Sequence, residues 1–296
     1  MTNKVVGRIV MTHNPVTAWE SYTRNLSRAH FRGYSDNIGM PGWYLDSGFT
    51  IVDRWGNLVE MLEFGLGRMV RSFDTMGRPE WEGFINTLTL LVERGGRRVA
   101  AAEMSLDGVA NKLWARYYDT VALSEARSSV YHDLDSQARF GVKADVMAAG
   151  SVTAAVANQG VQVTLRESAW PVPSEDLSLS SKIRAGEKVG LRVECKGFWD
   201  TLAWQRYNQT STTGSGAAST IVAAYIAACG QFIRASQIDV NTTPLPWEND
   251  ADRTPQDLIE GAVRFGDSAL NPWTAGVGWD RTFFYRQQTP HRLPGA

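Results

Sequence analysis

Two pairs of carboxylates have a spacing that could support chemistry. Glu80 and Glu82 flank a tryptophan, and Asp133 and Asp135 flank a leucine. Glycoside hydrolysis uses two carboxyl groups that flank the scissile bond, and alternate residues of a strand share one face. Either pair therefore allows the hypothesis of a glycan-processing site, with tryptophan rings stacking on the sugar. The alternative is that these residues are ordinary surface acids.

Two short motifs approach the pattern of a known enzyme but break its spacing. GLGRMV, residues 65–70, begins like a dinucleotide-binding loop, yet Val70 replaces the third glycine and a strand is expected to follow. FGDSAL, residues 265–270, is similar to the nucleophile block of Gly-Asp-Ser-Leu hydrolases, but that family places the block near its N-terminus. We interpret FGDSAL as the end of a helix.

The residue types that bind metals are scattered along the chain. Glu248, Asp250 and Asp252 have the spacing of a calcium loop, but Arg253 and Ile259 replace the glycine and glutamate that such a loop requires. No two of the four histidines have the spacing of a helical metal site. They are His13, His30, His132 and His291. The sequence predicts no metal, no cofactor and no catalytic residue.

Composition limits the classes of partner. Lys and Arg number 30 against 31 Asp and Glu, giving a net charge of −1, so no basic stripe for nucleic acid is expected. The opening residues do not resemble a signal peptide, and the longest apolar run, 221–229, is too short to cross a bilayer. We expect a soluble protein, made in the cytoplasm and without stable membrane insertion. Cys195 and Cys229 form no CxxC pair, and both fall on apolar faces, which predicts inert buried thiols.

The basic residues are mostly arginine, and the chain has eleven tryptophans. Both residue types are enriched at protein interfaces. A GC-rich genome, which favours arginine codons, is the alternative explanation for the arginines.

Residues 79–106 can be read with either the helical or the strand period of apolar residues. Trp81, Ile85 and Leu88 have helical spacing, but β-branched residues lie among them and Gly83 would weaken a helix. Gly95 and Gly96 supply the backbone angles of a tight turn. We predict a β-hairpin with its turn at these glycines, and a helix is the alternative.

The first third of the chain reads mainly as strands joined by turns. Strands are predicted at 4–11 and 48–57, a short buried helix at 58–67, and a strand, turn and strand over 68–85. One or two helical turns are expected after Ser105 or Asp107, before an aromatic strand. We predict an N-terminal β-rich, barrel-like domain over residues 1–123.

The remaining residues, 124–296, are predicted to form a second α+β domain. Ser151 would cap a helix over 151–170, and Leu191, Val193 and Cys195 form the apolar face of a strand. Helices are expected at 221–233 and after Thr254, and a last aromatic strand at 276–288. The predicted fold class is α+β, with antiparallel β-barrel-like domains and a few packed helices.

The order of several short motifs resembles the signature of phage tail-hub and baseplate proteins. A hairpin with a Trp/Phe-Glu-Gly motif is followed by an asparagine-containing turn and an aromatic strand, and the matching residues are Trp81, Glu82, Gly83, Asn111 and Tyr117. An Asp-x-x-Ser-Gln-x-x-aromatic-Gly pattern follows, and its residues are Asp133, Ser136, Gln137, Phe140 and Gly141. The strand and aromatic segment at 191–207 completes the series.

This resemblance implies a virion structural protein of the tail tip or baseplate, assembled in the host cytoplasm, and not an enzyme. It implies a homo-oligomeric ring, a trimer or a hexamer, that joins the tail tube to the spike or distal tail and contacts the tape measure. A glycan-directed hydrolase or carbohydrate-binding module of a tail is the first alternative. A soluble metabolic enzyme that binds a small molecule is the second.

Overall fold

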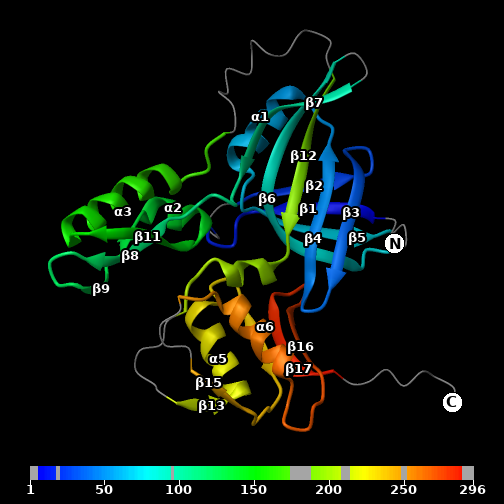
Figure 1. Ribbon diagram of the computed structural model, residues 1–296. Coiled ribbons are helices and arrows are strands. Elements are labelled where there is room, and N and C mark those ends of the chain that lie inside the picture. Colours follow the sequence, from blue (N-terminus) through cyan, green and yellow to red (C-terminus); the bar gives the residue numbers. More distant parts are fainter. Residues whose placement is uncertain are drawn as a thin grey trace. The chain divides into compact units, whose positions relative to one another are not determined.

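The structure is a computed structural model that describes residues 6–17, 21–94, 97–173, 188–207, 214–247 and 252–288. Helices and antiparallel sheets both contribute, so the fold class is α+β as predicted (Figure 1). The chain divides into two compact units. Unit 1 contains Met1–Asn37 and Asp46–Gly197, and unit 2 contains Ile38–Leu45 and Phe198–Ala296.

The main sheet of unit 1 is antiparallel in the order β3-β4-β12-β6-β5-β1-β2, with β7 also paired to β6. Its strands are β1 (Val6–Thr12), β2 (Thr23–Ser27), β3 (Phe31–Gly39), β4 (Gly42–Ile51), β5 (Met69–Asp74), β6 (Pro79–Arg94), β7 (Arg97–Ser105) and β12 (Lys188–Lys196). Alternate residues of these strands line one face and are fully buried, as Ile9, Leu88 and Val193 illustrate. Helix α1 (Trp55–Phe64) lies against β6 and β12 and ends at Gly65 (Figure 1).

The main sheet is strongly curled but open. Tyr34 of β3 reaches across the buried face to Ser72 of β5, with 2.7 Å between the two hydroxyl oxygens. Arg24, on the edge strand β2, forms a salt bridge with Asp53, just beyond β4. However, no ladder joins the edge strands β2 and β3 within the described residues. The barrel-like character predicted from the sequence is therefore not confirmed.

The hairpin predicted over 79–106 is confirmed. Strands β6 and β7 pair from Thr87 with Ser105 to Arg94 with Arg97, and the glycines expected at the turn lie outside the described residues. β6 pairs with β12 along its other edge. Its residues 81–90 are all buried, so both faces of the strand are covered over this stretch, which fits its many apolar residues. The β-branched residues and the sheet pairings therefore outweigh the helical spacing.

A smaller sheet in unit 1 combines β8 (Lys112–Asp119), β9 (Ser124–Arg127), β10 (Tyr131–His132) and β11 (Ala144–Val152). Helix α3 (Ala154–Ser168) packs on β8 and β11, and its Val161 and Leu165 contact Leu113 and Ala115 (Figure 1). The helix predicted at 151–170 is thus confirmed, but Thr153 takes the cap position because Ser151 still belongs to β11. Helix α2 (Leu134–Phe140) connects β10 to β11.

The helical turns expected after Ser105 are wrong. Residues 106–111 form a turn in which the amide of Val109 donates to the carbonyl of Leu106. The side chain of Ser105 instead bonds to Thr87, and that of Asp107 accepts from Asn86. Both capping side chains are thus used by the neighbouring strand.

Unit 2 contains the 3-10 helix η1 (Phe198–Ala203), β13 (Ser215–Ala217), α5 (Ala218–Cys229), β14 (Ala235–Ile238), β15 (Pro244–Pro246), α6 (Pro255–Phe265), β16 (Trp273–Val277) and β17 (Thr282–Gln287). Its main sheet runs β14-β17-β16 and includes the first residues of β4, which pair with β16. Helices α5 and α6 pack together (Figure 1). Thr254 caps α6, as predicted, by accepting from the amide of Asp257.

Two predictions for unit 2 need correction. The helix expected at 221–233 ends at Cys229, because Gly230 closes it with a hydrogen bond to Ile226. The last aromatic strand is a hairpin of β16 and β17, since Gly278 and Arg281 form a turn between them.

The border between the units differs from the one expected after residue 123. Strand β9 pairs with β8 across that position, and β12 pairs with β6, so residues 124–197 pack into unit 1. Sequence alone gives no sign of these long-range pairings, because a strand's partner is not encoded in its own pattern.

Candidate functional site

Most residues of the second motif gather around Asn111, a fully buried asparagine of the first motif. The amide nitrogen of Asn111 donates to the carbonyl of Gly141 at 2.8 Å and to the hydroxyl of Ser136 at 3.1 Å. Its side-chain oxygen accepts from the amide of Lys143 at 2.8 Å. We call Asn111, Asp133, Ser136, Gln137, Gly141 and Lys143 the Asn111 cluster.

Helix α2 brings the second motif to this asparagine. Asp133 accepts from the amide of Ser136 and so caps the helix, while its own amide donates to the carbonyl of Asn111. Gln137, one position further along the helix, donates to the same carbonyl at 2.7 Å. Gly141 ends the helix at a φ of 85°, a conformation that favours glycine. Asp133, Gln137 and Gly141 therefore each have an architectural task.

A buried lysine extends the cluster. The ammonium group of Lys143 donates to the carbonyl of Leu106 at 2.7 Å, in the turn that precedes β8. The hydroxyl of Ser136 donates to the carbonyl of Ala169, beyond the end of α3. The cluster thus joins the turn before β8, helix α2 and the end of α3. Lys143 was not identified from the sequence, although it lies two residues after the motif.

The first motif lies in β6 and also serves packing. Trp81 is fully buried, and a Cβ atom at Gly83 would lie 2.2 Å from the carbonyl oxygen of Lys196. Only glycine allows strand β12 to pass so closely. The carboxylate of Glu82 is buried and forms a salt bridge with Arg71 of the neighbouring strand, at 3.1 Å. Tyr117, the aromatic residue of the pattern, is buried in β8.

The acid pairs have different surroundings from those of a glycosidase. Glu82 faces Arg71, whereas Glu80 is half-buried at the start of β6. Asp133 caps α2, whereas Asp135 is exposed in its first turn. Asp133 lines a cavity together with Tyr131 and Arg166, and Asp135 is not part of that lining. These contacts favour structural tasks for Glu82 and Asp133.

The other candidate motifs also have structural contacts. Gly266 ends α6, and Asp267 accepts hydrogen bonds from the amides of Ala269 and Asn271, which agrees with the interpretation of FGDSAL as a helix end. Hydrogen bonds from Asn271 lower the pKa of Asp267. Of the calcium-like motif, Glu248 and Asp250 lie outside the described residues, and Asp252 is buried.

Metal-binding residue types stay apart in the described part of the chain, where no three His, Cys, Asp or Glu side chains gather as a metal ion would require. His30 contacts Ser27 and His132 contacts Gln137, while His291 is outside that part. Cys195 and Cys229 are buried, as predicted, and burial raises the pKa of the Cys195 thiol.

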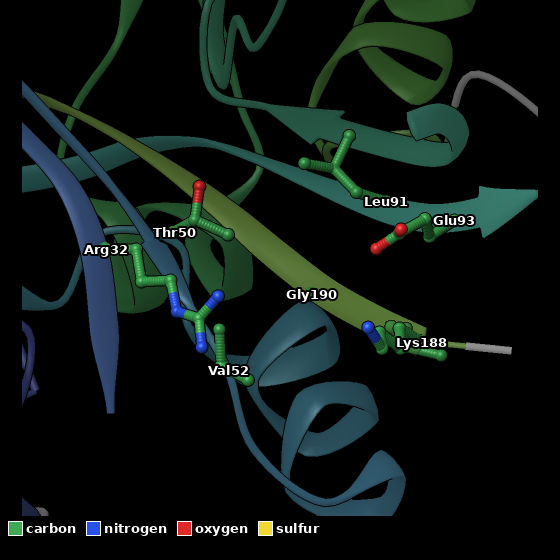
Figure 2. A pocket seen from close by; sticks show the side chains of 8 residues that line it. Arg32, Thr50, Val52, Leu91, Glu93, Lys188 and Gly190 are labelled. Atoms are coloured by element: carbon green, nitrogen blue, oxygen red, sulfur yellow. The ribbon is translucent and has the colours of Figure 1, made fainter. Parts of the chain in front are cut away.

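A hollow lies on the outer face of the main sheet of unit 1. Leu91 pairs with Gly190 across β6 and β12, and its side chain lies on the face opposite to the buried one that holds Leu90 and Leu191. The hollow has a volume of about 340 Å³. Figure 2 shows its lining, which we call the apolar hollow: Arg32, Thr50, Val52, Leu91, Glu93, Lys188, Val189 and Gly190.

The apolar hollow has an apolar floor and a charged rim. Leu91, Val52 and Val189 supply the apolar surface, while Arg32 and Lys188 bring positive charge to opposite sides and Glu93 lies across from Lys188 (Figure 2). This composition suits an apolar side chain with an acidic neighbour on the Arg32 side. Sequence reasoning missed the hollow because its residues come from four strands and the segment after β4.

Comparison of the chain with protein-family models, curated proteins and solved structures gave no match. Over the described residues, no helix combines the length and the apolar character needed to span a membrane.

Proposed function

We propose that this protein is a structural component of a phage tail tip or baseplate, and that it works by assembling with copies of itself and with other tail proteins. The observation that supports this proposal is the Asn111 cluster. Residues from two separate motifs of the resemblance meet in one buried hydrogen-bond network. Their shared order along the chain therefore has a physical basis in one structural unit.

The curled sheet supports the finer part of the proposal, a barrel-like domain. Tyr34 bonds to Ser72 across the interior, and the Arg24–Asp53 salt bridge spans the opening between the β2 edge and the end of β4. Such a unit has a fixed shape, which an architectural ring requires from each copy. In the proposed ring, the tail tube would sit on one side and the spike or distal tail on the other.

The arginine and tryptophan content fits a protein with large contact surfaces. In this proposal the carboxylates act in packing: Glu82 holds neighbouring strands together through Arg71, and Asp133 caps α2. The first alternative, a glycan-directed protein, is tested by Glu82→Gln and Asp135→Asn. We expect Asp135→Asn, at an exposed position, to assemble like the unmodified protein, and Glu82→Gln to lower the free energy of unfolding, because it removes the Arg71 salt bridge, without removing any other activity. Loss of polysaccharide turnover with assembly intact would favour the alternative.

Negative-stain imaging of the purified protein tests the proposal. We expect class averages of an annular particle with three-fold or six-fold symmetry. A globular particle of single-copy size at every concentration would contradict the proposed function.

A further inference from the structure

The turn between β8 and β9 presents two apolar side chains to solvent. We call residues 119–124 the tip turn. Val121 is 79% exposed and Leu123 is 70% exposed. The turn is nevertheless well ordered by hydrogen bonds, because the Asp119 carboxylate accepts from the amides of Val121 and Ala122, at 2.8 and 3.2 Å. The amide of Leu123 donates to the carbonyl of Asp119 at 2.8 Å.

Leu123 has an unfavourable backbone conformation for its residue type. Its φ is 54°, in the left-handed region, where a glycine would be free of steric cost. Leucine therefore costs energy at this position, and its exposed side chain recovers little through burial within the unit. An outlier of this kind points to a function of the side chain outside the fold.

The tip turn and the apolar hollow match in chemistry. Val121 and Leu123 supply apolar groups of a size that the hollow can receive, and Leu91 is part of its lining. Asp119 and Glu125 bring negative charge to the two sides of the tip. Arg32 brings positive charge to one side of the hollow, and on the other side Lys188 lies across from Glu93, so the charged lining residues leave one net positive charge, on the Arg32 side. Apolar contacts at the centre with opposite charges at the edge are typical of a protein interface.

We propose that the tip turn of one copy inserts into the apolar hollow of a second copy. This inference rests on the proposed function and adds the interface that would build the ring. The two surfaces differ, so the contact is head-to-tail: the copy that gives its tip keeps a free hollow, and the copy that receives it keeps a free tip. Such a contact continues from copy to copy until the ring closes.

Paired variants test this geometry by mass photometry. Val121→Asp with Leu123→Asp removes the tip, and Leu91→Arg blocks the hollow; each protein alone is expected to be monomeric. Mixed in equal amounts, they are expected to form dimers and nothing larger, because one functional tip meets one functional hollow. Arg32→Glu, on an exposed rim residue, replaces Leu91→Arg if that variant does not fold. Met76→Asp is the matched control, since Met76 is 78% exposed in another turn of unit 1.

Leu123→Gly separates binding from folding. Glycine accepts the backbone conformation, so the urea midpoint should not fall, while loss of the leucine side chain that the interface would bury should weaken association roughly tenfold or more. Association as tight as in the unmodified protein would overturn the interface.

Two further results would also overturn the interface while the proposed function stood: a ring built from either blocked variant alone, or a mixture that stays monomeric beside a normal ring of the unmodified protein. If the unmodified protein forms no oligomer, both this inference and the proposed ring fail.

Discussion

Replacing Asn111 with alanine should destabilise unit 1 substantially. The substitution removes three hydrogen bonds and leaves two buried backbone groups without their partner, the carbonyl of Gly141 and the amide of Lys143. Ser136 keeps its bond to Ala169, so it adds little to the loss. A buried polar group that loses its partner costs about 1–3 kcal/mol. We therefore expect the free energy of unfolding to fall by about 3 kcal/mol, a large share of the roughly 5–15 kcal/mol typical of a folded protein.

Urea unfolding followed by circular dichroism measures this change. Asn158→Ala is the control, because Asn158 bonds to Ser129 and Ala154 at the exposed surface of α3 and its loss should cost less than about 1 kcal/mol. The reasoning predicts a lower midpoint with an unchanged m-value for Asn111→Ala. If both variants lose the same small amount, Asn111 does not hold the motifs together.

Three further predictions follow from buried groups. Gly83→Ala should lower the free energy of unfolding by at least about 2 kcal/mol, because its Cβ would meet the carbonyl of Lys196; a urea midpoint equal to that of the unmodified protein would contradict this close approach. Burial raises the pKa of Tyr34, so its contribution to stability is present below the unfolded pKa of about 10 and is lost as the pH rises further. Above pH 10, the free energy of unfolding should fall less steeply with rising pH for Tyr34→Phe than for the unmodified protein. Identical slopes for the two proteins would show that Tyr34 does not contribute to this pH dependence. Cys195 and Cys229 should react with a thiol reagent only after unfolding, and rapid labelling of the native protein would show that they are accessible.

Local patterns predicted most individual elements. Alternating apolar residues identified β12, and the Thr254 cap with Pro255 identified the start of α6. In these segments the backbone's own hydrogen bonds and one buried face decide the structure. The turn after Ser105 was wrong because Thr87, far away in sequence, uses the serine hydroxyl.

The order of the strands in the main sheet was only partly predictable. Many short strands indicated antiparallel pairing, but the order of β4, β12 and β6 depends on contacts between distant segments. Contacts between distant segments also explain why the border between the units differs from the prediction. β6 ends at Arg94 and its partner β12 begins at Lys188, and no local pattern encodes a pairing over such a separation.

For the candidate site, the sequence identified several residues but not the contacts between them. The motif residues Asn111 and Ser136 were identified in advance, but their direct hydrogen bond was not, because it closes a long loop. The apolar hollow gave no sequence signal, and the strain at Leu123 is visible only in the backbone angles.

Self-assembly is the central claim of this account, and mass photometry of the unmodified protein over a range of concentrations tests it most directly. One copy has a mass of 32.7 kDa. We predict a dominant species of three or six copies that dissociates only on dilution. A single-copy species that persists at every accessible concentration would contradict the claim.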